Sequence, residues 1–408
     1  MTLTRSASLE GALGPRALAA AIFAMAVGGF AIGTTEFATM GLLPRIAESF
    51  DATIPQAGYL VSAYALGVVV GAPAIVLALP RAPRTGLLAG LALALALGNG
   101  LSALAPTLPT ELAARFLAGL PHGAYFGIAA LVASAISPPQ RRARSVSLVM
   151  VGLTVATMLG VPISTALGQG LGWRSAYWLV TAVAVLAFLA IWRWVPPVAV
   201  RPGASARREL SALRSSQLWL AVATGAVGFG GMFAVYSYIT PSMTQVAGIS
   251  ETDVPWVLAV FGVGMTLGTL LGGRVADRSL FGAIFGGLAA MAVTLAAFAL
   301  WATGPVPAIL LVLLVAVASQ LIGPALQTRL LDVSRQGPSL GAALHHSALN
   351  IGNALGAWVG GVVIAAGYSY LAPAWAGVAL ALAGLAVAGF ARLLERRAGP
   401  PGPSDMIG

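Results

Sequence analysis

Long apolar runs follow one another along the whole chain, separated by short stretches rich in proline, glycine and arginine. A helix needs about 20 apolar residues to cross the hydrocarbon core of a bilayer. Twelve runs reach that length, and each is predicted to be a transmembrane helix. They cover residues 17–43, 56–79, 84–105, 107–136, 145–169, 174–195, 216–241, 252–276, 280–302, 305–328, 340–366 and 370–393.

The composition agrees with this pattern. Hydrophobic residues make up 58% of the 408 residues and charged residues only 8%, whereas soluble domains carry about 25% charged residues. We therefore predict an all-α membrane protein. Cysteine is absent, which excludes a disulfide framework, a thiol nucleophile and a thiolate metal site; no metal site is predicted.

The net charge of +10 comes entirely from arginine, because the chain has no lysine. A basic excess can indicate nucleic-acid binding, but these arginines are scattered through short loops, which favours a role in membrane orientation. If the N-terminus is inside, 19 of the 22 arginines fall on the inner side. The opposite loops hold five acids: Glu48, Asp51, Glu111, Glu251 and Asp253. We predict a multi-pass membrane protein with both termini cytoplasmic and no nucleic-acid partner.

A polar interval divides the chain into two halves of six helices. We predict an N-terminal tail at 1–16, a first half at 17–195, a cytoplasmic linker at 196–215, a second half at 216–393 and a C-terminal tail at 394–408. Four pairs of residues share an offset of 197 positions: Pro44 and Pro241, Gly67 and Gly264, Gly71 and Gly268, and Arg81 and Arg278. Chance matching in glycine-rich helices is one explanation; the other is an internal repeat. Two repeats with a site at their interface are typical of a transporter.

Glu36 is the only acidic residue that the pattern places deep in an apolar run. A carboxylate in a spanning helix costs about 2.5–3.5 kcal/mol on insertion scales, so it usually has a function. Arg115 lies at similar depth in the fourth, antiparallel run. Burial disfavours an ionised Glu36 and a nearby arginine favours it, which would suit proton coupling; a static ion pair is the alternative. His122 follows Arg115 by two helical turns and titrates near neutral pH, so it is either part of a proton relay or a packing residue.

Two further segments are candidate moving parts. The segment Gly272–Gly282 places charges and glycine at the inner end of the eighth run, and with its first-half counterpart it forms a predicted cytoplasmic gate of Arg81, Gly273, Asp277 and Arg278. Topogenic charge alone is the other explanation. In the fifth run, a proline that permits a kink lies among glycines that permit close packing. Gly160, Pro162 and Gly168 therefore form either a seam for rocking motion or ordinary packing.

Polar and aromatic side chains inside the runs are candidates for a substrate cavity, although each could equally be a core or interfacial residue. They are Tyr64, Phe126, Tyr236, Asn350, Asn353 and Trp358. The chain has no P-loop, so direct ATP drive is disfavoured. It also has no GxSxG elbow and no HExxH motif, so we do not expect an enzyme.

These motifs together resemble the major facilitator superfamily, and within it the twelve-helix drug:proton antiporters, including arabinose-efflux-permease-like and chloramphenicol-resistance-like exporters. The resemblance rests on GTTEF and GLLP in the first run, RFLAGLPHGAYFG in the fourth, LGVPISTALGQGLGWR in the fifth and GGRVADR after the eighth. It implies two six-helix pseudo-repeats, Glu36 as the proton-linked acid and Arg115 as the arginine of the family's helix-4 motif. The first-half segment LPRAPRTG departs from the signature, because Pro80 replaces the usual aspartate.

We therefore expect a proton-coupled transporter of the bacterial plasma membrane that exports a drug, sugar or metabolite by antiport and alternating access. Its expected partners are a small-molecule substrate, protons and the lipid bilayer. We expect it to act as a monomer, with no bound cofactor and the proton gradient as its energy source. A symporter or facilitator for a sugar or metabolite is the first alternative, and a receptor or scaffold that does not transport is the second. Fold-level likeness cannot choose the substrate.

Overall fold

A computed structural model of the chain describes residues 13–198, 206–334 and 337–398. Within these ranges the regular structure is entirely helical, and twelve segments are long and apolar enough to cross a membrane. The predicted all-α membrane architecture is confirmed. Residues 1–12, 199–205, 335–336 and 399–408, which include much of both predicted tails and part of the predicted linker, lie outside the described residues.

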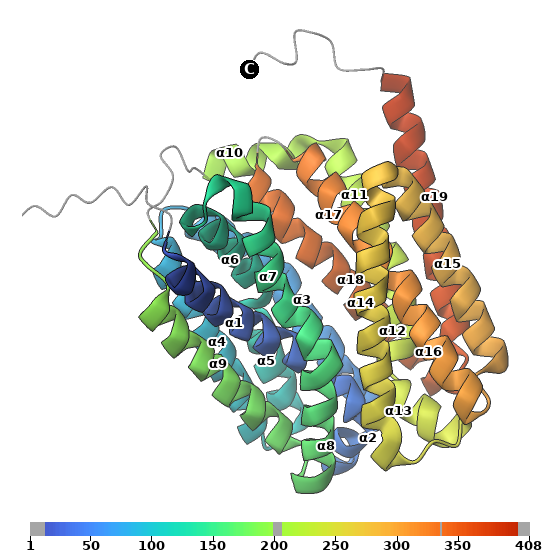
Figure 1. Ribbon diagram of the computed structural model, residues 1–408. Helices are drawn as coiled ribbons and strands as arrows, with labels where there is room; N and C mark the ends of the chain where they lie inside the picture. Colours follow the sequence, from blue (N-terminus) through green and yellow to red (C-terminus); the bar gives the residue numbers. More distant parts are fainter. Residues whose placement is uncertain (1–12, 199–205, 335–336, 399–408) are drawn as a thin grey trace, which may run out of the picture.

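The first half contains six spans (Figure 1). Several begin with a proline in the first helical turn, where its missing N–H is not needed. The fourth span is interrupted between Gly119 and His122, around Pro121, and the fifth contains a π-helical turn. The elements are α1 (Pro15–Gly41), α2 (Leu43–Ser49), α3 (Ile54–Ala78), α4 (Arg84–Leu104), α5 (Leu108–Gly119), α6 (His122–Ile136), η1 (Pro139–Arg141), α7 (Arg142–Val155), η2 (Ala156–Gly160), α8 (Val161–Leu171) and α9 (Arg174–Trp194).

The second half repeats this plan. Its elements are α10 (Ala206–Ser211), η3 (Ala212–Arg214), α11 (Ser216–Gly228), α12 (Gly230–Tyr236), α13 (Ile239–Pro241), η4 (Ser242–Val246), η5 (Glu251–Asp253), α14 (Val254–Arg278), α15 (Leu280–Trp301), α16 (Pro305–Gln320), α17 (Gly323–Val333), α18 (Pro338–Ala365) and α19 (Pro373–Ala398). The short α10 lies within the segment predicted as the linker. The last helix continues to Ala398, so the first residues of the predicted C-terminal tail at 394–408 are helical.

Equivalent glycines form equivalent helix–helix contacts in the two halves. A Cβ atom at Gly67 or Gly71 of α3 would overlap backbone atoms of Phe116 or of the residue that follows α5. A Cβ atom at Gly264 or Gly268 of α14 would overlap backbone carbonyls of α16. Glycine at i and i+4 lets two helix backbones approach closely. Both pairs therefore join the second and fourth spans of their half, which supports the internal repeat over chance matching.

The two halves stand side by side, with the blue-to-green helices of the first half beside the yellow-to-red helices of the second (Figure 1). Between them α3 packs along α18, while α1, η2 and α8 pack against α14. The helix ends that carry Arg81, Arg141 and Arg278 lie at one end of the bundle, which we call the arginine-rich end. The opposite end carries Glu48 and Glu251 and is called the acidic end.

Candidate functional site

Arg115 is fully buried and is held by α1. Its Nη1 donates a hydrogen bond of 2.8 Å to Thr35 Oγ1, and its Nη2 donates one of 3.1 Å to the Thr35 carbonyl oxygen. The Thr35 hydroxyl in turn donates to Asn99 Oδ1 of α4 at 2.5 Å. The guanidinium also lies 4.3 Å from the centre of the Tyr64 ring, a distance at which a cation is attracted to the ring face.

The expectation that Glu36 and Arg115 lie at similar depth is correct, because Thr35 is the residue before Glu36. However, no ion pair joins the two side chains, since the ion pairs among the described residues are elsewhere. Arg115 instead binds the hydroxyl and carbonyl of Thr35. Its positive charge still acts on the Glu36 carboxyl group. The arrangement thus keeps the acid near a cation without a direct bond between them.

Glu36 lies at the junction of the two halves and is only 7% exposed. The Asn353 side chain of α18 approaches its carboxyl group, although neither amide atom of Asn353 completes a hydrogen bond. The rings of Tyr64 and Tyr236 are near enough for the charge of Glu36 to act on them. Three of the predicted cavity residues, from α3, α12 and α18, therefore surround Glu36. Next to it, Phe37 packs edge-on against Tyr236 with ring centres 5.5 Å apart.

The three histidines of the chain gather nearer the arginine-rich end. His122 accepts or donates a hydrogen bond of 3.1 Å between its Nδ1 and the Tyr64 hydroxyl. Its ring centre lies 5.5 Å from that of His346, which stacks on Phe126 across the two halves. No group of three potential metal ligands is found among the residues that the structure describes. Phe126 and His122 therefore belong to an aromatic contact between the halves that adjoins the Glu36 site.

Asn350 and Trp358, two other predicted cavity residues, differ in burial. Asn350 is buried, donates to the His346 carbonyl oxygen at 3.1 Å and leaves its own Oδ1 without a partner. Trp358 is 52% exposed on α18, whereas the other predicted cavity residues are buried; its place in a substrate cavity stays a prediction. It lies about one turn beyond Asn353 along α18 but turned toward another face of that helix.

The glycines and proline of the fifth span lie where three elements meet. Gly160 ends η2, and a Cβ atom there would overlap Thr34 of α1; at Gly168 it would overlap Leu42. Pro162 occupies the first turn of α8, directly after the π-helical turn. On the other side, Gly262 of α14 lies so close to the Thr157 carbonyl that it too has no room for a side chain. This segment is a close backbone contact between the halves.

The predicted cytoplasmic gate is not assembled in this conformation. Arg81, Asp277 and Arg278 are exposed at the arginine-rich end, and Gly273 is partly exposed. No ion pair or hydrogen bond links Asp277 to any residue that the structure describes. A gate that locks by ion pairs in one conformation and releases in another therefore stays a prediction, and this structure shows its residues unpaired among those described.

At the acidic end, in contrast, an ion pair and a hydrogen bond join the two halves. Arg45 of α2 binds Glu251 through an Nε–Oε1 ion pair of 2.6 Å, and its Nη1 donates to the Gln169 carbonyl oxygen at 2.7 Å. Gln169 Nε2 donates to the Glu251 carbonyl oxygen at 2.8 Å. The hydrogen bond from Arg45 to Glu251 raises the pKa of Arg45 above its usual range, while partial burial acts in the opposite direction. We call Arg45, Gln169 and Glu251 the acidic-end clasp; the sequence did not predict it.

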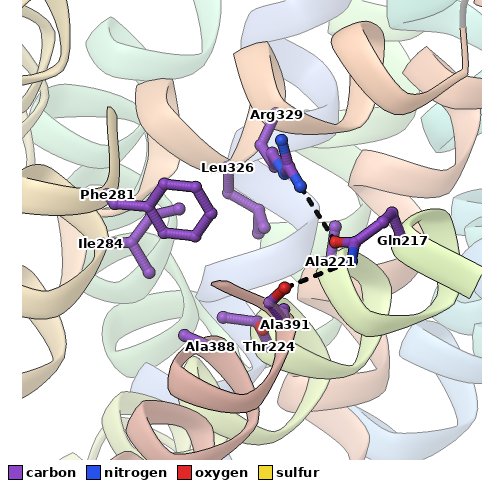
Figure 2. Close-up of a pocket in the computed structure, with 9 residues that line it drawn as sticks. All are labelled: Gln217, Ala221, Thr224, Phe281, Ile284, Leu326, Arg329, Ala388 and Ala391. Atoms are coloured by element: carbon purple, nitrogen blue, oxygen red, sulfur yellow. Dashed lines mark hydrogen bonds between the residues drawn. The ribbon is translucent and has the colours of Figure 1, made fainter. Parts of the chain in front are cut away.

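A small pocket lies within the second half alone (Figure 2). It is formed by α11, α15, α17 and α19 near the arginine-rich end. Arg329 donates to Gln217 at 2.9 Å and pairs with Glu395 at 2.9 Å. The remaining lining is largely apolar and includes Phe281, Leu326 and Ala388. Because it contains none of the predicted site residues and does not touch the junction of the halves, we do not assign transport to it.

A second buried acid, Glu111, lies in the first half and was not predicted from the sequence. Glu111, which was predicted to lie in a loop opposite the arginine-rich side, is completely buried in the first turn of α5. Its spacing of four residues before Arg115 places both on one helix face. This spacing was the feature of the sequence that could have indicated a buried Glu111 beside Arg115.

Comparison with known proteins agrees with this architecture. Residues 25–343 match the family model described as the Major Facilitator Superfamily. The inner membrane transport protein YdhP of Escherichia coli K12 is 38% identical over 349 residues, covering 86% of this chain and 90% of that protein. The chloramphenicol resistance protein of Streptomyces lividans is 33% identical over 374 residues, covering 90% of this chain and 95% of that protein.

Among solved structures, a bacterial homologue of the human lysosomal transporter Spinster, in an inward-facing and unoccupied conformation, aligns with a TM-score of 0.70 over 93% of this chain and 96% of that one. Its 17% sequence identity supports the shared fold alone. The resemblance to efflux-type members that the motifs indicated is confirmed by the sequence relatives. The chain is a multi-pass membrane transporter and belongs to the Major Facilitator Superfamily.

Proposed function

We propose that this protein exports a small organic molecule in exchange for protons by alternating access. The observation that carries the proposal is the position of Glu36, a buried carboxyl group at the junction of the two halves, beside Tyr236 of one half and within the influence of Arg115. A carboxyl group placed there changes its surroundings whenever the halves move against each other. Its affinity for a proton would change at the same time.

The distribution of arginine supports a cytoplasmic location for the arginine-rich end. On that assignment the acidic-end clasp closes the outer side, while Asp277 and Arg278 remain exposed on the inner side. This is the arrangement expected of a state that is closed to the outside. Loss of the clasp and assembly of the gate would accompany the change to the opposite state.

Glu36→Gln tests the proposal, because the amide keeps the size of the side chain but cannot carry a proton. The full chain is reconstituted in liposomes, and chloramphenicol is the first probe, since the printed name of one relative refers to that compound. The wild-type protein should accumulate the probe against a gradient when protons flow in the opposite direction. The variant should lose this accumulation but retain exchange of labelled for unlabelled probe.

Glu48→Gln, which changes an exposed glutamate at the acidic end, is the matched control and should behave as wild type. A compound panel, tested in the same vesicles, replaces chloramphenicol if wild type does not carry it. Proton-driven accumulation that is undiminished in Glu36→Gln would remove the role assigned to this carboxyl group. Accumulation driven by protons moving in the same direction as the solute would instead establish a symporter.

A further inference from the structure

Glu111 is a buried carboxyl group inside the membrane-spanning part of the bundle. It has no exposed surface, and among the residues that the structure describes neither of its carboxyl oxygens has a hydrogen-bond partner. The hydroxyls of Ser102 on α4 and Tyr177 on α9 face it, and the charges of Arg115 and Arg174 act on it. Because an ionised carboxylate is costly to bury without hydrogen bonds, this position favours a group that can take up a proton.

Arg115 is near two acids, and among the described residues it forms an ion pair with neither. Glu111 precedes it by four residues on α5, and Glu36 follows Thr35, which binds the guanidinium. The Nε atom of Arg115 is also buried without a partner. A buried charge that lacks a compensating charge costs several kcal/mol. One cation and two carboxyl groups are therefore cheapest to bury together when one acid is ionised and the other holds a proton.

A pair of hydroxyls lies close to the two acids. The Tyr177 hydroxyl, which faces Glu111, is 2.9 Å from Thr39 Oγ1 on α1, and either oxygen can be the donor. Thr39 is three residues after Glu36, so both side chains lie on neighbouring positions of one helix face. These two hydroxyls are the candidates for passing a proton between the acids, because a hydroxyl can accept one proton as it gives up another.

We propose that Glu111 is a second proton-binding group of this transporter and that it shares Arg115 as counter-ion with Glu36. The proposal rests on the proposed proton-coupled function. In one state Glu111 holds the proton and Glu36 is ionised; in the other the proton has moved to Glu36 and Glu111 is ionised. The site keeps one positive charge and one negative charge throughout, so the transfer does not change the charge buried between the helices.

Infrared titration of the purified full chain tests this without any substrate. The C=O stretch of protonated carboxyl groups is followed against pH in wild type, Glu36→Gln, Glu111→Gln and the double variant. We expect a titrating band in Glu36→Gln that is absent from the double variant. In each single variant the midpoint of the remaining buried acid should shift by about 1 pH unit or more, because two groups that share a counter-ion titrate as a pair. Glu48→Gln should leave both buried bands unchanged.

The proposal is overturned if Glu36→Gln and the double variant give the same titration, or if the midpoints do not shift. The pH profile of probe accumulation is a second readout. A purely structural Glu111 would lower accumulation equally at every pH in Glu111→Gln, which would also overturn the proposal; a displaced profile supports it. A titrating Glu111 in a protein whose accumulation ignores Glu36→Gln would show that the proposed function, rather than the second proton site, has failed.

Discussion

The acidic-end clasp should hold the two halves together at that end. Its ion pair is partly exposed, with 37% of the Arg45 side chain and 44% of the Glu251 side chain accessible, so the pair is worth about 0.2–1 kcal/mol. Arg45 also donates to the Gln169 carbonyl, but both residues belong to the first half, so this bond does not oppose separation of the halves. Arg45→Ala should therefore destabilise the closed acidic end by about 0.2–1 kcal/mol, which is about 1.5- to 5-fold in the closed-to-open ratio.

Glu251→Ala removes the ion pair but leaves the Gln169 bond to the backbone of residue 251 in place. Its expected effect on the closed-to-open ratio is therefore the same as that of Arg45→Ala, about 1.5- to 5-fold. In the double variant the effects should fall short of additive, because the shared pair is lost only once. Glu395→Ala, which breaks the ion pair with Arg329 inside the second half, is the matched control and should leave the ratio unchanged.

Double electron–electron resonance measures the populations directly. The chain has no cysteine, so spin labels can be attached without removing native thiols. Labels at Leu171 and Gln245, which are exposed in opposite halves, report on the acidic end. Labels at Gln140 and Gln327 report on the arginine-rich end. Unchanged distance distributions in Arg45→Ala, or an equal change in Glu395→Ala, would refute the reasoning.

Two further expectations concern close contact and exposure. Gly262→Ala should lower the free energy of unfolding by about 1–3 kcal/mol through overpacking, because its Cβ would overlap the Thr157 backbone across the halves. The melting temperature and the flux of the probe should both fall. Gly286→Ala on the neighbouring helix α15 has open space around it and should leave both unchanged, so equal losses in the two variants would contradict the contact. Trp358→Ala should leave transport intact because about half of the side chain is free of protein contacts, whereas Tyr236→Ala should reduce it; flux assays on matched amounts of protein compare them.

The sequence alone predicted the number of spanning helices, their limits to within a few residues and the two-half plan. These properties follow from the length of each apolar run and from the prolines and charges between runs, all of which act locally. The glycine pairs of α3 and α14 show that the repeat also extends to packing, because each pair meets the backbone of an equivalent helix. The depth of Glu36 and Arg115 in the membrane could likewise be predicted from the sequence, because the position of a residue along a spanning helix follows from counting residues.

The rotation of each helix about its own axis could not be predicted from the sequence. In a membrane a helix is apolar on the lipid side and on the packed side, so the hydrophobic pattern does not say which face turns inward. That is why Arg115 was not expected to bind Thr35. Glu111 was expected in a loop because it is charged and close to the end of an apolar run, and only the packing around the first turn of α5 shows that it is buried. The tertiary structure settles these positions, because they depend on contacts between segments far apart in the chain, and it is these contacts that place two acids and one arginine in a single buried site.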